Sequence, residues 1–449
     1  MSRKPSFTFI DLFAGIGGFH AVGQAMGGTC VYAAEIDAAA AAIYEQNWGM
    51  NSLKDLTLDA NDEIMNVPRH DVLFAGFPCQ PFSKSGAQKG MDETRGTLFW
   101  NIARIVQELR PSVLILENVR NLAGPRHAHE LAIIVETLKE FGYRVSKSPA
   151  IMSPHLIPPS LGGRPQVRER VFITATYVGE GSPDLDTEPV FVARPIAGWD
   201  ASTWDLASDL PLIDGETIPG TSLSAQEELW INAWDEFVSI MWEEREGRRL
   251  PGFPLWADEW VTTAELEIAI GTPRWKADFL RKNSEFYTAH QTTIDQWTQK
   301  WNIYSEVFPP SRRKLEWQAQ DTPRLWDCVM HFRPSGIRAK RATYLPALVA
   351  ITQTSIIGPR KRKLSTREAA RLQGLPDWFS FEGQTDAATY RQLGNGVSVG
   401  VVWQVLKAHA IRDEDYLKKS APDLLDAILS APDSPDTVLS FAGVKENHG

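Results

Sequence analysis

Hydrophobic and polar positions alternate regularly over the first part of the chain. Short apolar runs rich in β-branched and aromatic residues predict buried strands, and the segments between them have the spacing of amphipathic helices. The predicted strands are 7–13, 30–35, 71–76, 112–118 and 170–178, and the predicted helices are 37–47, 95–109 and 129–141. Alternation of this kind predicts an α/β domain with a doubly wound, mostly parallel sheet.

The pattern changes after about residue 180. Between residues 181 and 330 the alternation stops, and this stretch holds 12 of the 16 tryptophans. Helical spacing remains only at 224–244 and 262–271. Tryptophans at this density are usually core aromatics, so we interpret them as packing residues of a second, irregular domain.

Regular patterning returns at about residue 364. The segment LSTREAARLQGLP (364–376) predicts a helix, and GVSVGVVWQVLKAHAI (396–411) predicts a buried one. The tail from about residue 413 is polar and contains prolines, and its pattern predicts no particular element.

Length and cysteine content narrow the class of protein. A chain of 449 residues is longer than one hydrophobic core usually organises, which favours two domains. The cysteines, at 30, 79 and 328, have no spacing typical of a disulfide framework or a metal site, and they favour a reducing compartment. No run approaches the roughly 20 apolar residues of a membrane span, and no signal peptide precedes the first strand. We therefore expect a cytoplasmic protein with no metal ion and no membrane contact.

Charge is distributed unevenly along the chain. The net charge is −10, yet residues 310–374 carry 14 lysines and arginines against 4 aspartates and glutamates. The basic clusters lie at 311–314, 333–341 and 360–363. Such a strip is either a solvated face or a surface that follows the phosphates of a nucleic acid, and both interpretations stay open.

The first predicted strand ends in a glycine turn, FIDLFAGIGGFH (9–20). Ligands of a doubly wound sheet bind beyond the carboxyl ends of the strands, and glycines there let the backbone approach a ligand closely. The turn does not match the dinucleotide fingerprint. Glu35, about 20 residues further along, stands where an acidic side chain can bind ribose hydroxyls. These features favour a nucleoside-containing cofactor, and the alternative is a tight turn with a capping acid.

Other chemical groups lie at the ends of further strands. Cys79 follows the strand 71–76, Glu117 ends the strand 112–118, and Arg168 and Arg170 precede the strand 170–178. Each alone is more often structural than catalytic. Together they suit methyl transfer to carbon 5 of cytosine. A thiolate adding to carbon 6 activates carbon 5, a carboxyl group at N3 stabilises the developing charge, and an arginine at O2 holds the ring.

Six segments of the chain resemble, in order, the motifs of the DNA cytosine-5 methyltransferases. They are DLFAGIGGFH, GFPCQPFS, ENVRNL, QVRERVFI, LSTREAARLQGLP and RQLGNGVSVGVV, and they cover roughly 7–178 and 330–412. The resemblance implies a Rossmann-like fold that uses S-adenosyl-L-methionine. One departure is LIPPSLGGRPQ (156–166), which is longer and richer in proline and glycine than the usual approach to the arginine motif.

The resemblance also implies a role for individual residues. Cys79 would be the nucleophile, Glu117 would contact N3 and the exocyclic amine, and Arg168, together with Arg170, would support the ring and a phosphate. Ser85 would lie on the nucleophile loop that closes over DNA. The residues that would bind the cofactor are Phe13, Gly15, Gly17, Glu35, Leu98, Asn395 and, at the adenine amine, Asp55, with Asp59 as the alternative.

The resemblance implies a domain order as well. We expect a catalytic and cofactor-binding domain over 1–180, a target-recognition domain over 181–360, a segment 361–412 that returns to the catalytic domain, and a tail over 413–449. The basic, glycine-containing segment 332–344 is the first candidate for contact with DNA. Its candidate residues are Arg333, Arg338, Lys340 and Arg341, each of which could equally contact a phosphate or solvent.

We therefore expect a monomeric DNA (cytosine-5-)-methyltransferase that flips a cytosine out of a specific duplex site. The associated expectation is a restriction–modification or related defence role, with a cognate endonuclease that is not stably bound. A tRNA cytosine methyltransferase shares the motifs, but the large recognition region favours DNA. A catalytically inactive DNA-binding or regulatory relative is a further alternative, but such a protein would not require Cys79, Glu117 and Arg168 together. A cysteine hydrolase lacks a base beside Cys79 and leaves the glycine turn unexplained.

Overall fold

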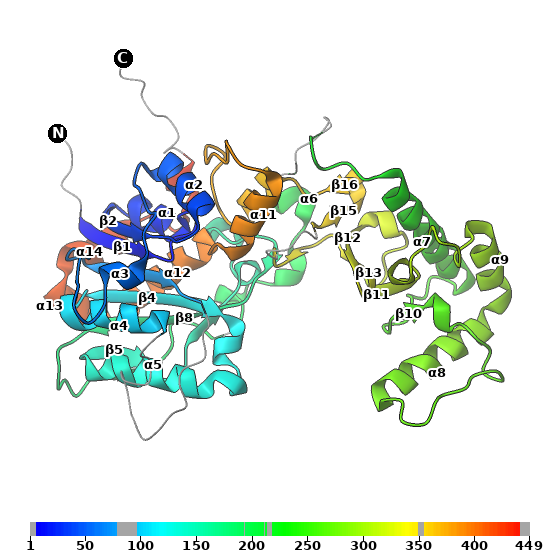
Figure 1. Ribbon diagram of the computed structural model, residues 1–449, viewed down its shortest axis with the longest axis horizontal. Coiled ribbons are helices and arrows are strands. Elements are labelled where there is room, and N and C mark those ends of the chain that lie inside the picture. The colour runs from blue at the N-terminus through cyan, green and yellow to red at the C-terminus, as the bar shows by residue number, and fades with distance from the viewer. Residues whose placement is uncertain are drawn as a thin grey trace, which may run out of the picture. The chain divides into compact units, whose positions relative to one another are not determined.

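The chain divides into two units (Figure 1). Unit 1 consists of Met1–Pro211, Pro346–Ile351 and Thr366–Gly449, and unit 2 of Leu212–Leu345 and Thr352–Ser365. The computed structural model describes residues 6–78, 97–192, 194–210, 212, 218–348 and 354–440.

An eight-stranded sheet forms the centre of unit 1. Its order is β2-β1-β3-β4-β8-β5-β9, with β6 beside β8. The strands are β1 (Phe7–Leu12), β2 (Gly28–Ala34), β3 (Val72–Gly76), β4 (Val113–Val119), β5 (Tyr143–Ser146), β6 (Ala150–Met152), β8 (Arg170–Tyr177) and β9 (Asp186–Thr187). Strands β1 to β4 are parallel, as predicted. β8 is antiparallel to β4, β5 and β6, because no crossover helix separates β5, β6 and β8 along the chain.

Helices cover both faces of this sheet, which confirms the doubly wound α/β class. On one face, Ile10, Leu73 and Leu114 belong to a buried cluster with residues of α4 and α5. On the other face, Phe9 packs edge-on against His20 of α1, and α1 packs on α12. The helices of unit 1 are α1 (Gly18–Ala25), α2 (Ala38–Trp48), α3 (Leu56–Asp59), α4 (Leu98–Leu109), α5 (Ala128–Glu140), α6 (Leu206–Asp209), α10 (Thr366–Leu372), α11 (Asp386–Asn395) and α12 (Val399–Arg412).

The tail, for which the pattern predicts no element, forms three further helices. They are α13 (Glu414–Ser420), α14 (Pro422–Ser430) and α15 (Asp436–Leu439). Asp436 forms an ion pair with Arg164, with 2.6 Å between Oδ1 and Nη2. The buried side chains of these helices include Leu417, Leu424, Leu425, Ile428 and Leu439. Short helices of this kind are stabilised by tertiary packing, which explains why a polar local sequence gives little indication of them.

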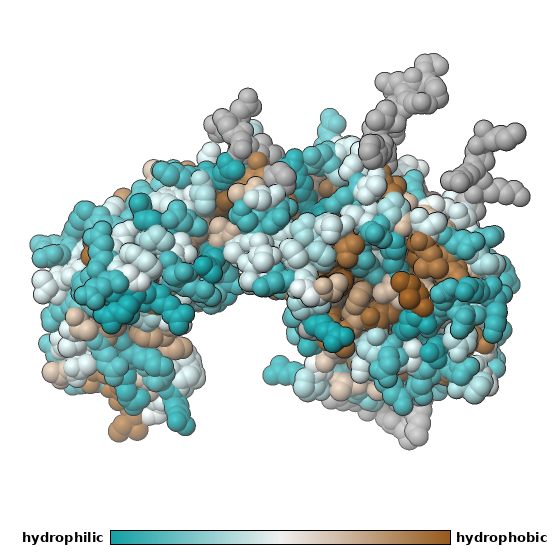
Figure 2. Space-filling model, turned by 180° about the vertical axis from the view of Figure 1, so that it is seen from behind, coloured by the Kyte–Doolittle hydropathy of each residue, from teal (hydrophilic) through white to brown (hydrophobic). Residues whose placement is uncertain are grey.

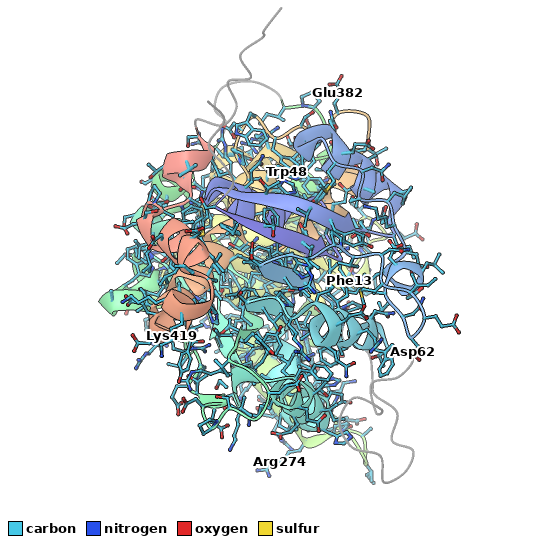
Figure 3. All side chains as sticks on the ribbon, turned by 90° about the vertical axis from the view of Figure 1, so that its left-hand side faces the viewer. Phe13, Trp48, Asp62, Arg274, Glu382 and Lys419 are labelled. Carbon is cyan, nitrogen blue, oxygen red and sulfur yellow. The ribbon has the colours of Figure 1, made fainter. Side chains whose placement is uncertain are left out.

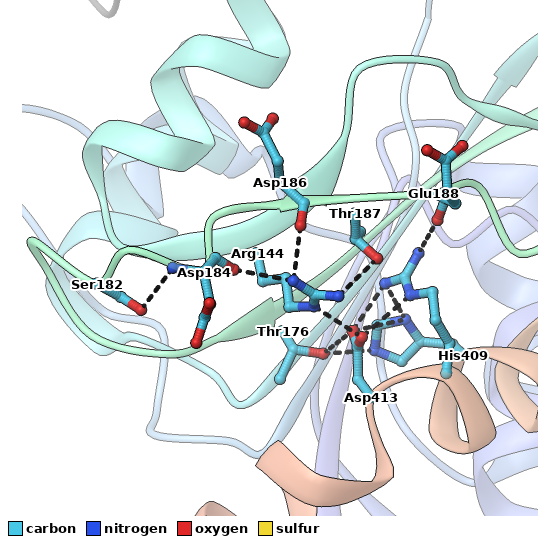
Figure 4. A network of polar contacts seen from close by, with 10 residues as sticks. Arg144, Thr176, Ser182, Asp184, Asp186, Thr187, Glu188, His409 and Asp413 are labelled. Atoms are coloured by element: carbon cyan, nitrogen blue, oxygen red, sulfur yellow. Dashed lines mark hydrogen bonds and ion pairs between the residues drawn. The ribbon is translucent and has the colours of Figure 1, made fainter.

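A buried polar network joins the start of α13 to the sheet (Figure 4). Arg412 donates to Nδ1 of His409 over 3.1 Å, so that nitrogen is an acceptor and Nε2 carries the proton. His409 Nε2 lies 3.0 Å from Thr176 Oγ1, and the Thr176 hydroxyl donates to Asp413 over 2.7 Å. Arg144 and Arg412 also donate to Asp413. The network fixes the neutral tautomer of His409 and ties the C-terminal helices to β5 and β8.

Unit 2 has a sheet of its own, in the order β10-β11-β13-β12-β15-β16. The strands are β10 (Leu255–Trp256), β11 (Lys314–Gln318), β12 (Cys328–Arg333), β13 (Gly336–Arg341), β15 (Ile356–Ile357) and β16 (Arg362–Lys363). The helices are α7 (Ala225–Glu244), α8 (Arg274–Ala289) and α9 (Gln291–Trp301). β7 (Gln166–Val167) belongs to unit 1, and β14 (Leu345–Pro346) spans the boundary.

The tryptophans of unit 2 pack mainly as predicted. Trp234 of α7 contacts Trp297 and Phe237, and Trp260 stacks on Phe237, all within one buried cluster. The predicted helix 224–244 is confirmed, and Ser224 and Glu227 cap it reciprocally. Hydrophilic residues cover most of the visible face of unit 2 in Figure 2.

The predicted helix at 262–271 is wrong. Thr262 instead bonds the Glu265 carboxylate and forms a turn, and Ile270 is fully exposed. An apolar face without a packing partner does not stabilise a short helix in water. Among the helices in the described ranges, none combines the length and apolar character needed to cross a membrane.

Candidate active site

A cavity of about 500 Å³ lies in unit 1 at the carboxyl ends of the parallel strands. The strand ends that line it include Phe13 after β1, Glu35 after β2, Gly76 of β3 and Glu117 of β4. The other lining groups include Ala14, Gly15, Phe19, Asp37, Phe77, Pro78, Asn118, Arg170, Arg391, Gln392, Gly394, Asn395 and Val397. Segments from both ends of the sequence therefore meet in one site.

The glycine turn after β1 forms one wall. Gly15 has a φ of +53°, and a β-carbon on it would meet no atom within 4 Å, so the turn is open on that side. Gly17 has a φ of +91°, and a β-carbon there would lie 2.1 Å from the indole nitrogen of Trp48. Figure 3 labels Phe13 and Trp48 in this region. Gly15 thus leaves space for a ligand, whereas Gly17 is required by packing and does not line the cavity.

Glu35 lies at the edge of the same turn. One carboxylate oxygen accepts a hydrogen bond from the Gly15 amide and the other from the Asp37 amide, each over 2.8 Å. Asp37 in turn caps α2 through bonds to Ala39 and Ala40. Each oxygen of a carboxylate keeps a further lone pair, so Glu35 can still accept from a ligand.

Glu117 and Arg170 form an ion pair on the opposite wall. The antiparallel pairing of β4 with β8 places Arg170 opposite Val119, two residues beyond Glu117. Arg170 Nε lies 2.9 Å from Glu117 Oε1, and the Glu117 side chain is only 10% exposed. Burial raises the pKa of Glu117, while the nearby Arg170 and Arg168 oppose the rise. Gly76 lies beside Glu117 in the sheet.

Asn118 links this wall to the segment that precedes the predicted nucleophile. Its side-chain amide donates to the carbonyl of Phe77 over 2.8 Å, which joins the end of β4 to the end of β3. Pro78 lines the cavity next to Phe77. The following residue, Cys79, and Ser85 both lie outside the described residues.

Arg168 occupies a different position from Arg170. Its guanidinium is buried and does not line the cavity. Nη2 donates to the carbonyls of Gly394 (2.8 Å) and Gly396 (2.6 Å), and Nη1 donates to that of Leu348 (3.3 Å). Burial lowers the pKa of Arg168 to about 9, so the side chain stays charged at neutral pH. Arg168 therefore fixes the backbone on either side of Asn395.

Asn395 ends α11 and lines the cavity beside Arg391 and Gln392. Val397 packs on Gly18, where a β-carbon would lie 2.7 Å from the valine side chain. Sequence reasoning missed Arg391, Gln392 and Asn118 as site residues. The first two belong to the RQLGNGV segment and Asn118 to the ENVRNL segment, so the motifs contained the signal.

The remaining predicted cofactor residues do not line the cavity. Asp55 caps α3 and accepts from the amide and hydroxyl of Thr57. Asp59 accepts from the Tyr32 hydroxyl over 2.6 Å. Leu98 is the first residue of α4. The choice between Asp55 and Asp59 stays open.

The four predicted DNA-binding residues of unit 2 lie on β12 and β13. Arg333 ends β12, and the other three belong to β13. Arg341 forms an ion pair with Asp321, with 2.9 Å between Nη2 and Oδ1. Arg338 pairs with Glu316 on the neighbouring strand β11.

The family of C-5 cytosine-specific DNA methylases matches residues 7–410 of the chain. The chain belongs to this family. The methylase is therefore a DNA (cytosine-5-)-methyltransferase, and the resemblance inferred from the six motifs is confirmed.

Curated relatives cover nearly the whole methylase. The Type II methyltransferase M.AluI of Cellulosimicrobium cellulans is 48% identical over 98% of this chain and 99% of its own length. The Type II methylase M.HgiEI of Herpetosiphon aurantiacus is 42% identical over 88% of this chain and 95% of its own. The Type II methyltransferase M.HhaI of Haemophilus parahaemolyticus is 29% identical over 88% of this chain and 91% of its own. The similarity therefore includes unit 2 as well as unit 1.

Proposed function

We propose that this methylase transfers the methyl group of S-adenosyl-L-methionine to carbon 5 of a cytosine in a specific duplex site, through a covalent bond between Cys79 and carbon 6. The observation that carries the proposal is the cavity itself. It brings Glu117 and Arg170 together with the open glycine turn and with Pro78, the residue before Cys79. A carboxyl group, a guanidinium and the glycine turn that would hold the cofactor lie in one cavity, and this combination suits methyl transfer to cytosine.

The described residues fit the cofactor. A cavity of about 500 Å³ is within the range of small-molecule sites, which is roughly 300–1,000 Å³. Gly15 leaves the turn open to the ligand, Glu35 would accept from the ribose hydroxyls, and Phe13 and Asn395 would enclose the cofactor. When bound, S-adenosyl-L-methionine supplies a methyl group activated by a sulfonium.

The opposite wall fits a cytosine. A cytosine stacked in a duplex is out of reach, so the base would have to rotate out of the helix into the cavity. Burial raises the pKa of Glu117 and so makes protonation of its carboxyl group easier, and a protonated carboxyl group would donate to ring N3. We assign the contact with O2 to Arg170 because it lines the cavity, and a positioning role to Arg168 because its guanidinium binds backbone carbonyls.

The proposed reaction balances through these groups. The Cys79 thiolate would form a bond to carbon 6 while Glu117 gives its proton to N3, so the ring electrons collect at carbon 5. Carbon 5 would then bond to the methyl group as the bond from methyl to the sulfonium sulfur breaks, which would leave a neutral thioether. Loss of the carbon 5 proton to solvent would then restore the double bond and expel the thiolate. Glu117 would recover its proton from N3. Cys79 and Glu117 thus return to their starting states.

We further propose that the methylase serves a restriction–modification system. Its relatives M.AluI, M.HgiEI and M.HhaI are all named as Type II enzymes, and M.AluI matches over 98% of this chain. We also propose that the methylase acts as a monomer and that its cognate endonuclease does not bind it stably.

Bisulfite sequencing of plasmid DNA from cells that express the wild type or Cys79→Ala tests the proposal. We expect methylated cytosines in one recurring sequence context with the wild type and none with the variant. Both proteins should bind S-adenosyl-L-methionine equally, because Cys79 is not among the cofactor residues. Methylation that persists in the variant would exclude the covalent route. A soluble wild type that methylates tRNA but not DNA would reject duplex DNA as substrate.

A further inference from the structure

One face of the unit 2 sheet carries a row of polar and basic side chains. Along β13, Ile337 and Ala339 are fully buried in the core, so Arg338 and Lys340 point to the opposite face. The same alternation on β11 buries Leu315 and Trp317 and turns Glu316 and Gln318 outward. The strand pairing then aligns Glu316 with Arg338, and Gln318 with Lys340. We call the side bearing Glu316, Arg338 and Lys340 the outer face.

Arg338 is held by one edge of its guanidinium. Nε and Nη2 both lie 2.6 Å from the same carboxylate oxygen of Glu316. The other oxygen of Glu316 accepts from the Ser335 hydroxyl over 3.0 Å. The pair is mostly buried, with 25% of the Arg338 side chain and 13% of the Glu316 side chain exposed. The geometry therefore fixes the plane of the guanidinium.

Within the part of the chain that the structure describes, the other edge of the same guanidinium has no hydrogen-bond partner. A guanidinium has a side edge, formed by Nε and Nη2, and an end edge, formed by Nη1 and Nη2. Glu316 occupies the side edge, which leaves two parallel N–H groups on the end edge. Guanine presents two matching acceptors, O6 and N7, in the major groove, and arginine binds them in a bidentate manner.

The groups around Arg338 make this face electropositive. His331 lies directly opposite Arg338 on β12, and Arg333 ends the same strand. Burial lowers the pKa of Arg333 and of Lys340, and the neighbouring charge of Arg338 lowers both further. Burial likewise lowers the pKa of His331 to about 4, so its imidazole is neutral. Arg333, Arg338 and Lys340 thus repel one another, and Arg333 and Arg338 also interact with the carboxylate of Glu316. A ligand with many acceptors would relieve this repulsion.

We propose that Arg338 reads a guanine of the target site through its end edge and that Glu316 is the positioning residue that orients it. The inference rests on the proposed function, because it takes duplex DNA as the substrate. A β-sheet face can enter the major groove of B-form DNA. Every site that contains a cytosine also contains the guanine paired with it, so a guanine is always present.

Duplexes carrying 7-deazaguanine test the proposal. This analogue pairs normally but lacks N7, so each guanine of the target site is replaced in turn and the affinity of the full-length methylase is measured. We expect one position at which replacement weakens wild-type binding about 5-fold or more. At that position Arg338→Ala and Arg338→Lys should show no further loss, because lysine has no second parallel donor. Glu316→Gln should still bind the duplex but should discriminate less between guanine and 7-deazaguanine at that position.

Arg324 provides a matched control within unit 2. Its Nε and Nη2 also contact one oxygen of a carboxylate, that of Asp235 on α7. Arg324→Ala should keep the wild-type response to 7-deazaguanine at every position. A wild type that responds at no guanine, or an Arg338→Ala variant that keeps the wild-type profile, would overturn the proposal. Methylation of the unmodified duplex is measured on the same protein, and its persistence distinguishes this result from a failure of the proposed function.

Discussion

Glu117 in unit 1 and Glu316 in unit 2 each pair with an arginine, and the two pairs are similarly buried. The Glu117 side chain is 10% exposed and that of Glu316 is 13% exposed. Their neighbours differ. Glu117 faces a cavity in which burial is the largest influence on its pKa. Glu316 lies among Arg338, Arg333 and Lys340 on an electropositive sheet face.

The difference shows how one pair of residue types serves two purposes. In the proposed reaction the carboxyl group of Glu117 is the working group, and its protonation state decides what it can do at N3. In the proposed recognition the arginine is the working group, and the carboxylate only holds it. Substitutions at the two glutamates should therefore affect different quantities, namely rate for Glu117 and base discrimination for Glu316.

Glu117→Gln should have the largest effect. Glutamine keeps the size of the side chain but cannot give a proton to N3, so we expect methyl transfer to slow by about 10²- to 10⁴-fold. Single-turnover transfer from isotopically labelled cofactor to duplex DNA measures this rate. Cofactor affinity should stay near the wild-type value. A similar loss of rate in Glu316→Gln would remove the distinction between the two pairs.

Prediction from the sequence succeeded for strands that are buried along their whole length. The runs 71–76 and 112–118 correspond to β3 and β4 within one residue, because these strands are buried on both faces and read as continuous apolar segments. β13 escaped prediction because Gly336, Ala339 and Lys340 are residue types that are depleted in strands. Only the pairing with β11 and β12 reveals that Arg338 and Lys340 point to one side of a sheet.

The candidate site shows the same limit. Glu117 and Arg170 were predicted because strand ends of a doubly wound sheet meet at one edge. Arg391 and Gln392 were not, since α11 reaches the cavity only through tertiary packing such as that of Val397 on Gly18. The different positions of Arg168 and Arg170 could not be predicted from the sequence either. Arg168 precedes β8 and Arg170 begins it, but only the folded chain shows that Arg168 points to the carbonyls beside Asn395.

The buried network of unit 1 predicts that the free energy of unfolding depends on pH, an effect of intermediate size. Burial lowers the pKa of His409 from 6.5 to about 3, so the folded state keeps the imidazole neutral. The unfolded state takes up a proton below about pH 6.5. Stability should therefore be fully present above that pH and should fall by about 1.4 kcal/mol per pH unit on acidification. Urea unfolding between pH 7 and pH 4.5 measures it.

His409→Gln separates this group from other titrating residues. The variant should be less stable at pH 7, because the bonds to Thr176 and Arg412 change. On acidification its stability should also fall less steeply than that of the wild type, because unfolding of the variant takes up one proton fewer. An unchanged slope would mean that His409 is not the neutral, buried group that the network requires.

Lys340→Ala should have the smallest effect and a different character from Arg338→Ala. Lys340 shares the outer face with Arg338 but has a compact ammonium, which suits a phosphate rather than a base edge. We expect binding to weaken equally for all duplexes, and the slope of log affinity against log salt to decrease by about 0.9. Lys282→Ala, which removes a lysine paired with Asp278 on α8, is the control and should leave the slope unchanged. Altered base discrimination with an unchanged slope would instead place Lys340 beside Arg338 as a reading residue.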